Sequence, residues 1–321
     1  MGDSCDPEQS VPSLAEDNGG SQSDSRTQQQ LPQACAPAQQ HYEHCTDLVD
    51  DCSAGPSSTM TTKQLQEYWR EMKSHRKPVK LLFEIPTARI VELPLCRYVM
   101  YQVVVIKSGS YDAKQVSIER RYSDFERLHQ ELLQDFSEEL EEVTFPRKKV
   151  TGNFAPEIIT ERRAAFKDYL ARLSFLNCVR RSPAFLAFFT HDELRLAHSC
   201  LRGGQYARAL QVLLPVLDLQ EKLVQHSPVL LVPTLCAVLV CHRDLDDSAS
   251  AFSMGERALA LTRRVHRHLY RAPLLATLID LGYELGRPIA VLQEELQRLQ
   301  DSLRGRVSQL SLKELVVQEF T

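Results

Sequence analysis

A change of hydrophobic period between residues 97 and 136 constrains the fold of this chain more than any other feature. Residues 97–106, RYVMYQVVVI, are dense in β-branched and aromatic side chains, which favour β-strands. From Phe125 to Phe136 the apolar residues instead fall on one face of a helix. Because such a helix must bury its apolar face against the strands, we expect an α+β domain.

Further strand and helix patterns lie on both sides of this segment. Strand-like runs occur on either side of Pro86 and again before the first helix, at residues 79–85, 88–93 and 116–122. A second helix is predicted from near Glu157, and a third, short apolar helix follows Ser182 and ends at Phe189. With the two runs around Pro86 taken as one strand, the order is three strands, a helix, a basic loop and two helices, which predicts one domain over residues 78–190.

Residues 1–60 have a different composition. They contain ten Asp and Glu residues and one Arg, a net charge of −9, and are rich in Ser, Gln, Gly and Pro. Since such a segment cannot bury enough apolar area to offset its chain entropy, we expect a disordered acidic tail. Residues 61–190 carry a net charge of +5, from 22 basic and 17 acidic residues, which suits an anionic ligand.

The predicted tail contains five potential metal ligands, Cys35, His41, His44, Cys45 and Cys52. Their spacings match no usual zinc motif, and no apolar core surrounds them. We therefore favour a plain tail over a zinc site and predict no metal centre.

Residues 61–77 predict a short amphipathic helix that links the tail to the domain. Thr61 and Gln64 have the spacing of a capping box. Apolar residues follow at helical spacing before Pro78, namely Leu65, Tyr68, Trp69 and Met72. Such a helix can pack on the next domain or anchor the chain to a membrane or partner, and its short apolar face favours packing.

The strongest functional signal lies where the last predicted strand enters the first helix, at Arg120-Arg121-Tyr122-Ser123. An arginine beside a helix N-terminus can clamp a phosphate with its planar guanidinium. Tyr122 offers a flat face to a sugar-like ring, and Ser123 is a candidate N-cap with a free hydroxyl.

Two later segments supply further cations, Arg147, Lys148 and Lys149 in a loop and Arg162 and Arg163 in the second helix. Each pair alone is typical of solvated surface charge. Together, cations from three segments suit one multiply charged phosphate ligand.

Three motifs in order resemble the phox-homology (PX) domain over about residues 78–190: R-R-Y-S-D-F-x-x-L from Arg120, F-P-R-K-K-V-T-G-N-F from Phe145 and E-R-R-x-x-F-x-x-Y-L from Glu161. The resemblance implies a three-stranded antiparallel sheet with a helical subdomain. It also implies a phosphoinositide ligand, most often phosphatidylinositol 3-phosphate, and no further cofactor.

The resemblance assigns roles to residues that match its motifs. Arg121 would bind the 3-phosphate with help from Ser123, and Tyr122 would stack under the inositol ring. Arg162 would bind the 4- and 5-hydroxyls, so that a 4-phosphate would displace it.

The loop between the helices departs from the family pattern, because only Pro146 remains of the usual P-x-x-P sequence. Lys148 would meet the 1-phosphate, and Lys149 is an alternative. Val150 and Phe154 would enter the bilayer, where one buried Phe adds about 1.5–3 kcal/mol. For Phe154 a core contact is an equal alternative, so Val150 is the preferred inserted residue.

Residues 191–321 predict an all-α domain of helical hairpins, with helices starting near Gly203, spanning 247–265 and surrounding Leu281. The pattern L-x-x-L-G-x-x-L from Leu278 resembles tetratricopeptide repeats. Long BAR-type helices are excluded by five prolines, Pro215, Pro228, Pro233, Pro273 and Pro288.

A PX domain followed by a tetratricopeptide-like (PXB) domain resembles the small PX–PXB subgroup of sorting nexins. This implies a cytoplasmic, peripheral membrane protein of early endosomes that acts as an adaptor in vesicle trafficking and protein transport. Its helical domain would bind the cytoplasmic tail of a membrane receptor, a selectin ligand if the nearest resemblance holds. The alternative is a scaffold located by its helical domain, with a PX fold that does not bind lipid selectively.

Several other classes are excluded. The longest apolar run, Val229–Cys241, has 13 residues, whereas a membrane span needs about 20. Nine cysteines without a C-x-x-C pair or signal peptide indicate reduced, cytoplasmic thiols. We find no nucleotide-binding, metalloprotease or hydrolase motif, so we expect no enzyme. The net charge of −4 disfavours nucleic acid, and the basic run Arg263–His268 is expected to be a solvated helix face.

Overall fold

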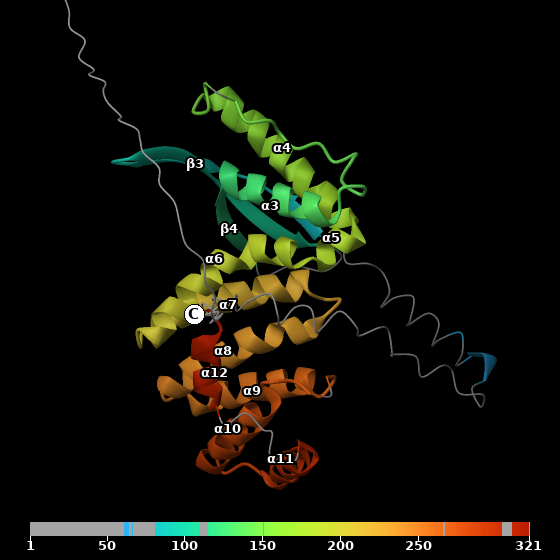
Figure 1. The fold of residues 1–321 in the computed structure, drawn as a ribbon. Coiled ribbons are helices and arrows are strands. Elements are labelled where there is room, and N and C mark those ends of the chain that lie inside the picture. Colours follow the sequence, from blue (N-terminus) through green and yellow to red (C-terminus); the bar gives the residue numbers. More distant parts are fainter. Residues whose placement is uncertain are drawn as a thin grey trace, which may run out of the picture. The chain divides into compact units, whose positions relative to one another are not determined.

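The computed structural model describes residues 61–63, 66, 81–108, 115–149, 151–265, 267–303 and 310–320 (Figure 1). All of them belong to one unit, Pro37–Thr321. The predicted tail with its five potential metal ligands lies outside these ranges, as do Leu65, Tyr68, Trp69 and Met72 of the predicted linker helix. Thr62, Lys63 and Gln66 are helical.

Four strands form an antiparallel sheet: β1 (Leu81–Glu84), β2 (Ala88–Leu93), β3 (Cys96–Lys107) and β4 (Val116–Arg121). Met100 of β3 pairs with Arg89 of β2 and with Arg121 of β4, and Val104 pairs with Glu84 of β1 and with Ser117 of β4. Thus β1 and β2 follow one another along the same edge of β3.

The prediction of three strands is therefore wrong in number, because the first strand is divided in two. Pro86 lies between β1 and β2 and has no amide hydrogen to give to β3, so the pairing is interrupted there. Pairing resumes at Thr87, whose carbonyl oxygen accepts a hydrogen bond from the Gln102 amide at 3.0 Å.

The sheet shares its core with helices α3 (Tyr122–Asp135) and α4 (Pro156–Phe175). Alternate residues of β3, among them Tyr101 and Val103, are fully buried, as the period of a strand requires. The rings of Phe125 in α3 and Phe166 in α4 stack with centroids 3.9 Å apart, and Phe166 also meets Tyr101 edge to face. The predicted α+β domain is present.

Helix α3 begins directly after β4. The N-cap is Arg121 and not Ser123, which is the second residue of the helix. The prediction of a serine cap fails because Asp124 supplies the capping carboxylate, which accepts a hydrogen bond from the Arg121 amide at 2.9 Å.

Two more helices follow, α5 (Asn177–Arg181) and α6 (Pro183–Arg202). Ser182 caps α6 as predicted, since its Oγ accepts a hydrogen bond from the Phe185 amide at 3.1 Å. The helix does not end at Phe189, however, because buried Leu194 and Leu201 continue its apolar face. It therefore runs through the predicted domain boundary between residues 190 and 191.

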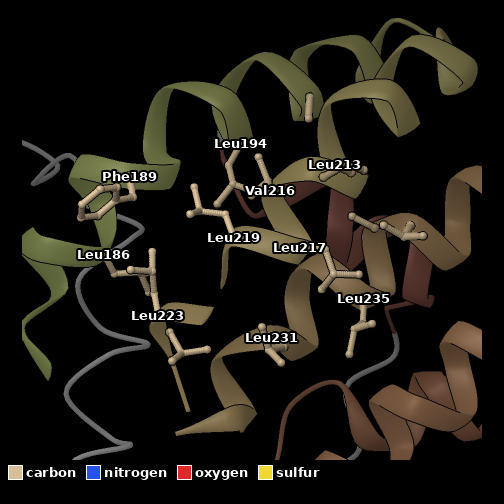
Figure 2. Packing of buried hydrophobic residues seen from close by; sticks show 14 of the residues in the cluster. Leu186, Phe189, Leu194, Leu213, Val216, Leu217, Leu219, Leu223, Leu231 and Leu235 are labelled. Atoms are coloured by element: carbon tan, nitrogen blue, oxygen red, sulfur yellow. The ribbon is translucent and has the colours of Figure 1, made fainter. Parts of the chain in front are cut away.

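The remaining elements are α7 (Tyr206–Leu223), the 3₁₀ turn η1 (Pro228–Leu231), α8 (Val232–Asp244), α9 (Ser248–Thr262), α10 (Arg271–Glu284), α11 (Ala290–Leu303) and α12 (Leu312–Gln318). From α6 to α11 each helix packs against the next. Figure 2 shows the apolar side chains of α7, such as Leu217 and Leu219, near those of α6 and α8. The predicted helical region is present.

Pro215 lies inside α7 without ending it, contrary to the prediction. Pro228 is instead the first residue of η1 and Pro233 the second residue of α8, positions at which a proline costs no internal hydrogen bond. Among the described residues the longest helices, α4 and α6, have 20 residues each. None of the helices in the described ranges is long and apolar enough to cross a membrane.

Two buried cations join the sheet to the helical region. Arg120, 3% exposed, donates to both carboxylate oxygens of Glu193 in α6 at 2.7 and 2.6 Å and to the Phe188 carbonyl oxygen at 2.6 Å. Lys222 of α7 donates to the Val105 carbonyl oxygen of β3 at 3.0 Å. These contacts position β4 and β3 relative to α6 and α7.

Candidate functional site

A cavity of about 300 Å³ opens where β3, the β4–α3 junction, the loop before α4 and α4 itself meet. It brings together all five predicted ligand residues, Arg121, Tyr122, Ser123, Lys148 and Arg162. The other residues that line it are Cys96, Arg97, Tyr98, Val99, Tyr101, Asn153 and Phe154. Its volume is in the range of small-molecule sites.

In each of the two arginine pairs, Arg120-Arg121 and Arg162-Arg163, one arginine lines the cavity and the other makes contacts that hold the fold together. Successive residues of a strand point to opposite faces, so Arg120 turns to Glu193 while Arg121 reaches the cavity. On α4, Arg162 lines the cavity, whereas Arg163 donates from Nε to the Ile85 carbonyl oxygen at 2.8 Å. Of the two pairs, the fold thus directs Arg121 and Arg162 to the cavity.

The Arg121 side chain is about half exposed and only loosely held. Its Nε lies 3.5 Å from Asp124 Oδ1, and its guanidinium carbon lies 5.7 Å from the centroid of the Tyr98 ring. A guanidinium in this state can exchange a weak internal contact for a bidentate contact with a phosphate.

Tyr122 and Arg162 form a fixed part of the cavity wall. The Tyr122 hydroxyl donates to the Pro146 carbonyl oxygen at 2.8 Å, and burial raises the pKa of Tyr122, so the phenol stays protonated. Arg162 is 6% exposed, with its guanidinium carbon 4.7 Å from the Tyr122 ring centroid. Its Nη2 donates to Asn153 Oδ1 at 2.7 Å.

Two buried polar groups at the cavity make no hydrogen bond of ordinary geometry within the described part of the chain. They are Arg162 Nε and the hydroxyl of Tyr101, a residue that is 0% exposed. Burial raises the pKa of Tyr101, and the Arg162 side chain beside the hydroxyl offsets part of the rise through a hydrogen-bonding interaction and its charge. Since buried donors are nearly always satisfied, these groups favour a polar ligand in the cavity.

Sequence reasoning missed the contribution of β3, above all Arg97, Tyr98 and Tyr101. These residues belong to a run that has the composition of an ordinary strand. Tyr98 lies close to Arg121 because the strand register places Met100 opposite Arg121. That register cannot be read from the sequence alone.

The two loop lysines differ in their surroundings. Lys148 lines the cavity, with Nζ 3.3 Å from a carboxylate oxygen of Glu126 and 5.9 Å from the Tyr122 ring centroid. Lys149 donates to a carboxylate oxygen of Glu161 at 2.7 Å and is not among the described residues that line the cavity. This arrangement favours Lys148 over Lys149 as a ligand.

The predicted inserting residues are only partly described. Val150 lies outside the described ranges. Phe154 is half-buried at the cavity, and the Arg97 guanidinium carbon lies 4.4 Å from its ring centroid. The loop turns just before it at Gly152, where a φ of 75° favours glycine.

Over the described ranges, no three His, Cys, Asp or Glu side chains gather in a metal-binding arrangement. The described cysteines, Cys96, Cys178, Cys200, Cys236 and Cys241, are free thiols. The site is therefore defined by cations, hydroxyl groups and aromatic rings.

Comparison with known proteins agrees with this arrangement. Residues 109–192 match the family model of the PX domain. The chain is 52% identical to sorting nexin-20 of Bos taurus over 84% of each chain, and 50% identical to sorting nexin-20 of Rattus norvegicus over 84% of this chain and 87% of the relative. It is 35% identical to sorting nexin-21 of Mus musculus over 82% of this chain and 73% of the relative.

A PX domain implies phosphoinositide binding, peripheral association with membranes and a role in trafficking. These relatives are non-enzymatic PX-domain proteins, which confirms the expectation that the chain is not an enzyme. The extent and identity of the matches establish that the chain belongs to the sorting nexin family.

Proposed function

We propose that the cavity binds the headgroup of phosphatidylinositol 3-phosphate and thereby docks the chain on the cytoplasmic face of early endosomes, where it acts as an adaptor in vesicle trafficking and protein transport. The observation that carries this proposal is the convergence of Arg121, Lys148 and Arg162, from three separate segments, on one cavity. Three cations around one small volume suit a ligand with two phosphates.

Each ligand residue has a distinct role in this proposal. Arg121, the loosely held guanidinium, binds the 3-phosphate together with the Ser123 hydroxyl. Lys148 exchanges Glu126 for the 1-phosphate, and Tyr122 supports the inositol ring. Charge-assisted hydrogen bonds of this kind are stronger than neutral ones.

Selection of the 3-phosphate over other positions is the role of Arg162. Its guanidinium is buried and held by Asn153 and the Tyr122 ring, so it cannot move aside easily. Its unpaired Nε suits a hydroxyl group of the inositol ring. A 4- or 5-phosphate in that place would have to displace it, which supports the proposed specificity.

Membrane insertion would add a second anchor beside the headgroup. Val150 and Phe154 are the predicted inserting residues, and Phe154 would have to leave Arg97 to reach lipid. We propose the turn between β2 and β3 as a further insertion site, because Leu95 there is 99% exposed and lies next to Cys96 and Arg97, which line the cavity. A headgroup contact and an apolar contact together give the two signals that stable docking requires.

The domain organisation is part of the proposal. An acidic tail covers residues 1–60, a linker helix 61–77, the PX domain 78–190 and a tetratricopeptide-like (PXB) domain 191–321. The series of packed helices from α6 to α11 supports the last assignment. This domain binds the cytoplasmic tail of a membrane receptor as cargo, with a selectin ligand as the specific candidate.

Sedimentation with liposomes that carry each phosphoinositide tests the lipid ligand. The wild-type chain should pellet selectively with phosphatidylinositol 3-phosphate, and Arg121→Ala should not. Arg127→Ala is a matched control, because Arg127 of α3 is likewise an exposed arginine beside Asp124 but does not line this cavity. If the wild type shows no selectivity, the chain is a scaffold located by its helical region.

A further inference from the structure

The C-terminal helix α12 lies on the face of the helical stack formed by α6, α8 and α10 (Figure 1). It buries three aliphatic side chains there, Leu312, Leu315 and Val316. A helix of seven residues is not stable by itself in water, so its helical form depends on this face. We call the parts of α6, α8 and α10 that contact α12 the α12-binding face.

Each helix of the α12-binding face also contributes a polar contact to α12 or the residues after it. His198 of α6 donates from Nδ1 to the Val316 carbonyl oxygen at 3.1 Å. Asp244 of α8 accepts a hydrogen bond from Lys313 Nζ at 2.7 Å. Tyr270, the N-cap of α10, donates its hydroxyl to the Glu319 carboxylate. The three contacts fix the register of the bound segment.

The segment ends with an aromatic contact on α6. The Phe320 ring lies 4.7 Å from the His198 ring, between centroids, and the Phe320 carbonyl oxygen accepts a hydrogen bond from Arg202 Nη1 at 3.1 Å. This segment therefore meets directional donors and acceptors from three helices in addition to its apolar contacts, the combination by which a groove can recognise an amphipathic helix.

We propose that the α12-binding face is a docking site for short amphipathic helices of partner proteins, and that residues 310–320 are its intramolecular occupant. A competing helix carries aliphatic residues at the positions of Leu312, Leu315 and Val316. It carries a basic residue at the position of Lys313, and an acidic and then an aromatic residue after its last turn. The proposal does not depend on the lipid cavity.

The tether determines when a partner can compete. A covalently attached ligand acts at an effective concentration that reaches the millimolar range for short linkers. A free partner of equal intrinsic affinity therefore binds poorly in dilute solution. A partner concentrated with this chain on one membrane displaces α12 more readily.

The test uses the full chain and a fluorescent peptide of residues 310–320. Leu315→Asp places a charge in the buried contact and should release the chain's own helix while leaving the α12-binding face intact. The peptide should bind this variant at least tenfold more tightly than it binds the wild type. Val291→Asp is the matched control, because Val291 is 71% exposed on α11, and should behave as the wild type.

A charge exchange tests the register. In the Leu315→Asp chain, a further Asp244→Lys substitution should weaken binding of the peptide. A peptide that carries Lys313→Asp should recover binding to this double variant. A folded Leu315→Asp chain that binds no peptide, or a wild type that binds equally well, would overturn the proposal.

If Leu315→Asp does not fold, a protease site inserted between residues 303 and 310 gives a second route. After cleavage, the labelled peptide should replace the native segment during gel filtration. A cleaved segment that never exchanges with excess peptide is an integral part of the fold, and that outcome also contradicts the proposal.

Discussion

Single residues in the cavity are held in place before any ligand arrives. Arg162 rests on the Tyr122 ring and on Asn153, and the Tyr122 hydroxyl is bound to the Pro146 carbonyl oxygen. Because these side chains are already ordered, little conformational entropy remains to be lost when the headgroup binds. Arg121 and Lys148, which are more exposed, are the side chains that must move.

The Tyr101 hydroxyl allows a direct test of whether a buried polar group of the cavity contacts the lipid. It lies beside the Arg162 side chain but makes no hydrogen bond of ordinary geometry in the described part of the chain, so Tyr101→Phe should leave the free energy of unfolding within about 0.5 kcal/mol of the wild type. If the hydroxyl contacts the lipid, affinity for the 3-phosphate liposomes should fall by the value of one hydrogen bond, about 0.5–1.5 kcal/mol. Denaturant titration and liposome binding measure the two effects, and unchanged affinity would place the hydroxyl outside the ligand contact.

His198 makes stability depend on pH. The pKa of His198 is lowered to about 4 from a usual value of 6.5, mainly by burial and also by nearby Arg202, while the hydrogen bond with the Val316 carbonyl oxygen offsets part of the shift. The unfolded chain therefore takes up a proton before the folded chain does, and stability is lost as the pH falls from 6.5 toward 4. Between pH 7 and pH 5 the loss from this residue is about 2 kcal/mol.

Urea unfolding at the two pH values measures this loss. The variant His198→Gln keeps a donor for the Val316 carbonyl oxygen and should reduce the pH dependence. His129 and His226, whose pKa values burial also lowers, leave a residual slope. An identical pH dependence in wild type and variant would contradict the assignment to His198.

Among the elements, the junction of β4 and α3 does the most to build the site. No loop separates the strand from the helix, so Arg121, Tyr122 and Ser123 lie together at the cavity. Asp124 closes this junction, since its carboxylate accepts a hydrogen bond from the Arg121 amide. The same carboxylate lies near the guanidinium groups of Arg121 and Arg127.

Substitutions of Asp124 should distinguish how much its capping hydrogen bond and how much its negative charge contribute to stability. Asp124→Ala removes the cap and should cost about 1 kcal/mol of unfolding free energy, whereas Asp124→Asn keeps a capping oxygen and should cost less. Chemical denaturation of both variants tests this order. Equal losses would mean that the carboxylate charge, and not the cap, stabilises the junction.

Sequence periodicity located most elements but not their limits. The β2 run at 88–93 was predicted with its observed bounds, because alternation and flanking prolines are local signals. The length of α6 and the inclusion of Pro215 in α7 were not predicted, because packing against later helices decides both. The five ligand residues predicted from the motifs all line the cavity, but Tyr98 and Tyr101 reach it through strand pairing over long range.

At the scale of the whole molecule, the sheet and the helical region share buried contacts. Arg120 is paired with Glu193, and Lys222 with the Val105 carbonyl oxygen, so neither region can open without exposing a charge bound to the other. We expect the two regions to unfold in a single transition, because the free energy of each contact is lost from both together.

Removal of one partner of the buried ion pair between Arg120 and Glu193 should strongly destabilise the fold. Glu193→Ala leaves Arg120 buried without its carboxylate and should lower the unfolding free energy by about 3–5 kcal/mol. The double variant Arg120→Met with Glu193→Leu should lose less, because it leaves no unpaired charge. Denaturant unfolding of the three chains gives the comparison. A double variant that is less stable than Glu193→Ala would show that the arginine keeps other essential contacts.

The alternation of Arg120 and Arg121 in β4 also limits how this chain can vary in evolution. A strand that slips by one residue turns every side chain to the opposite face. One deletion within β4 before Arg120 would turn Arg121 to the face of Arg120 and Tyr122 to the face of Arg121, so the cavity would lose its cation from this strand. Related chains that retain both functions must keep the spacing from β4 to α3 free of insertions, even where the individual side chains of the strand diverge.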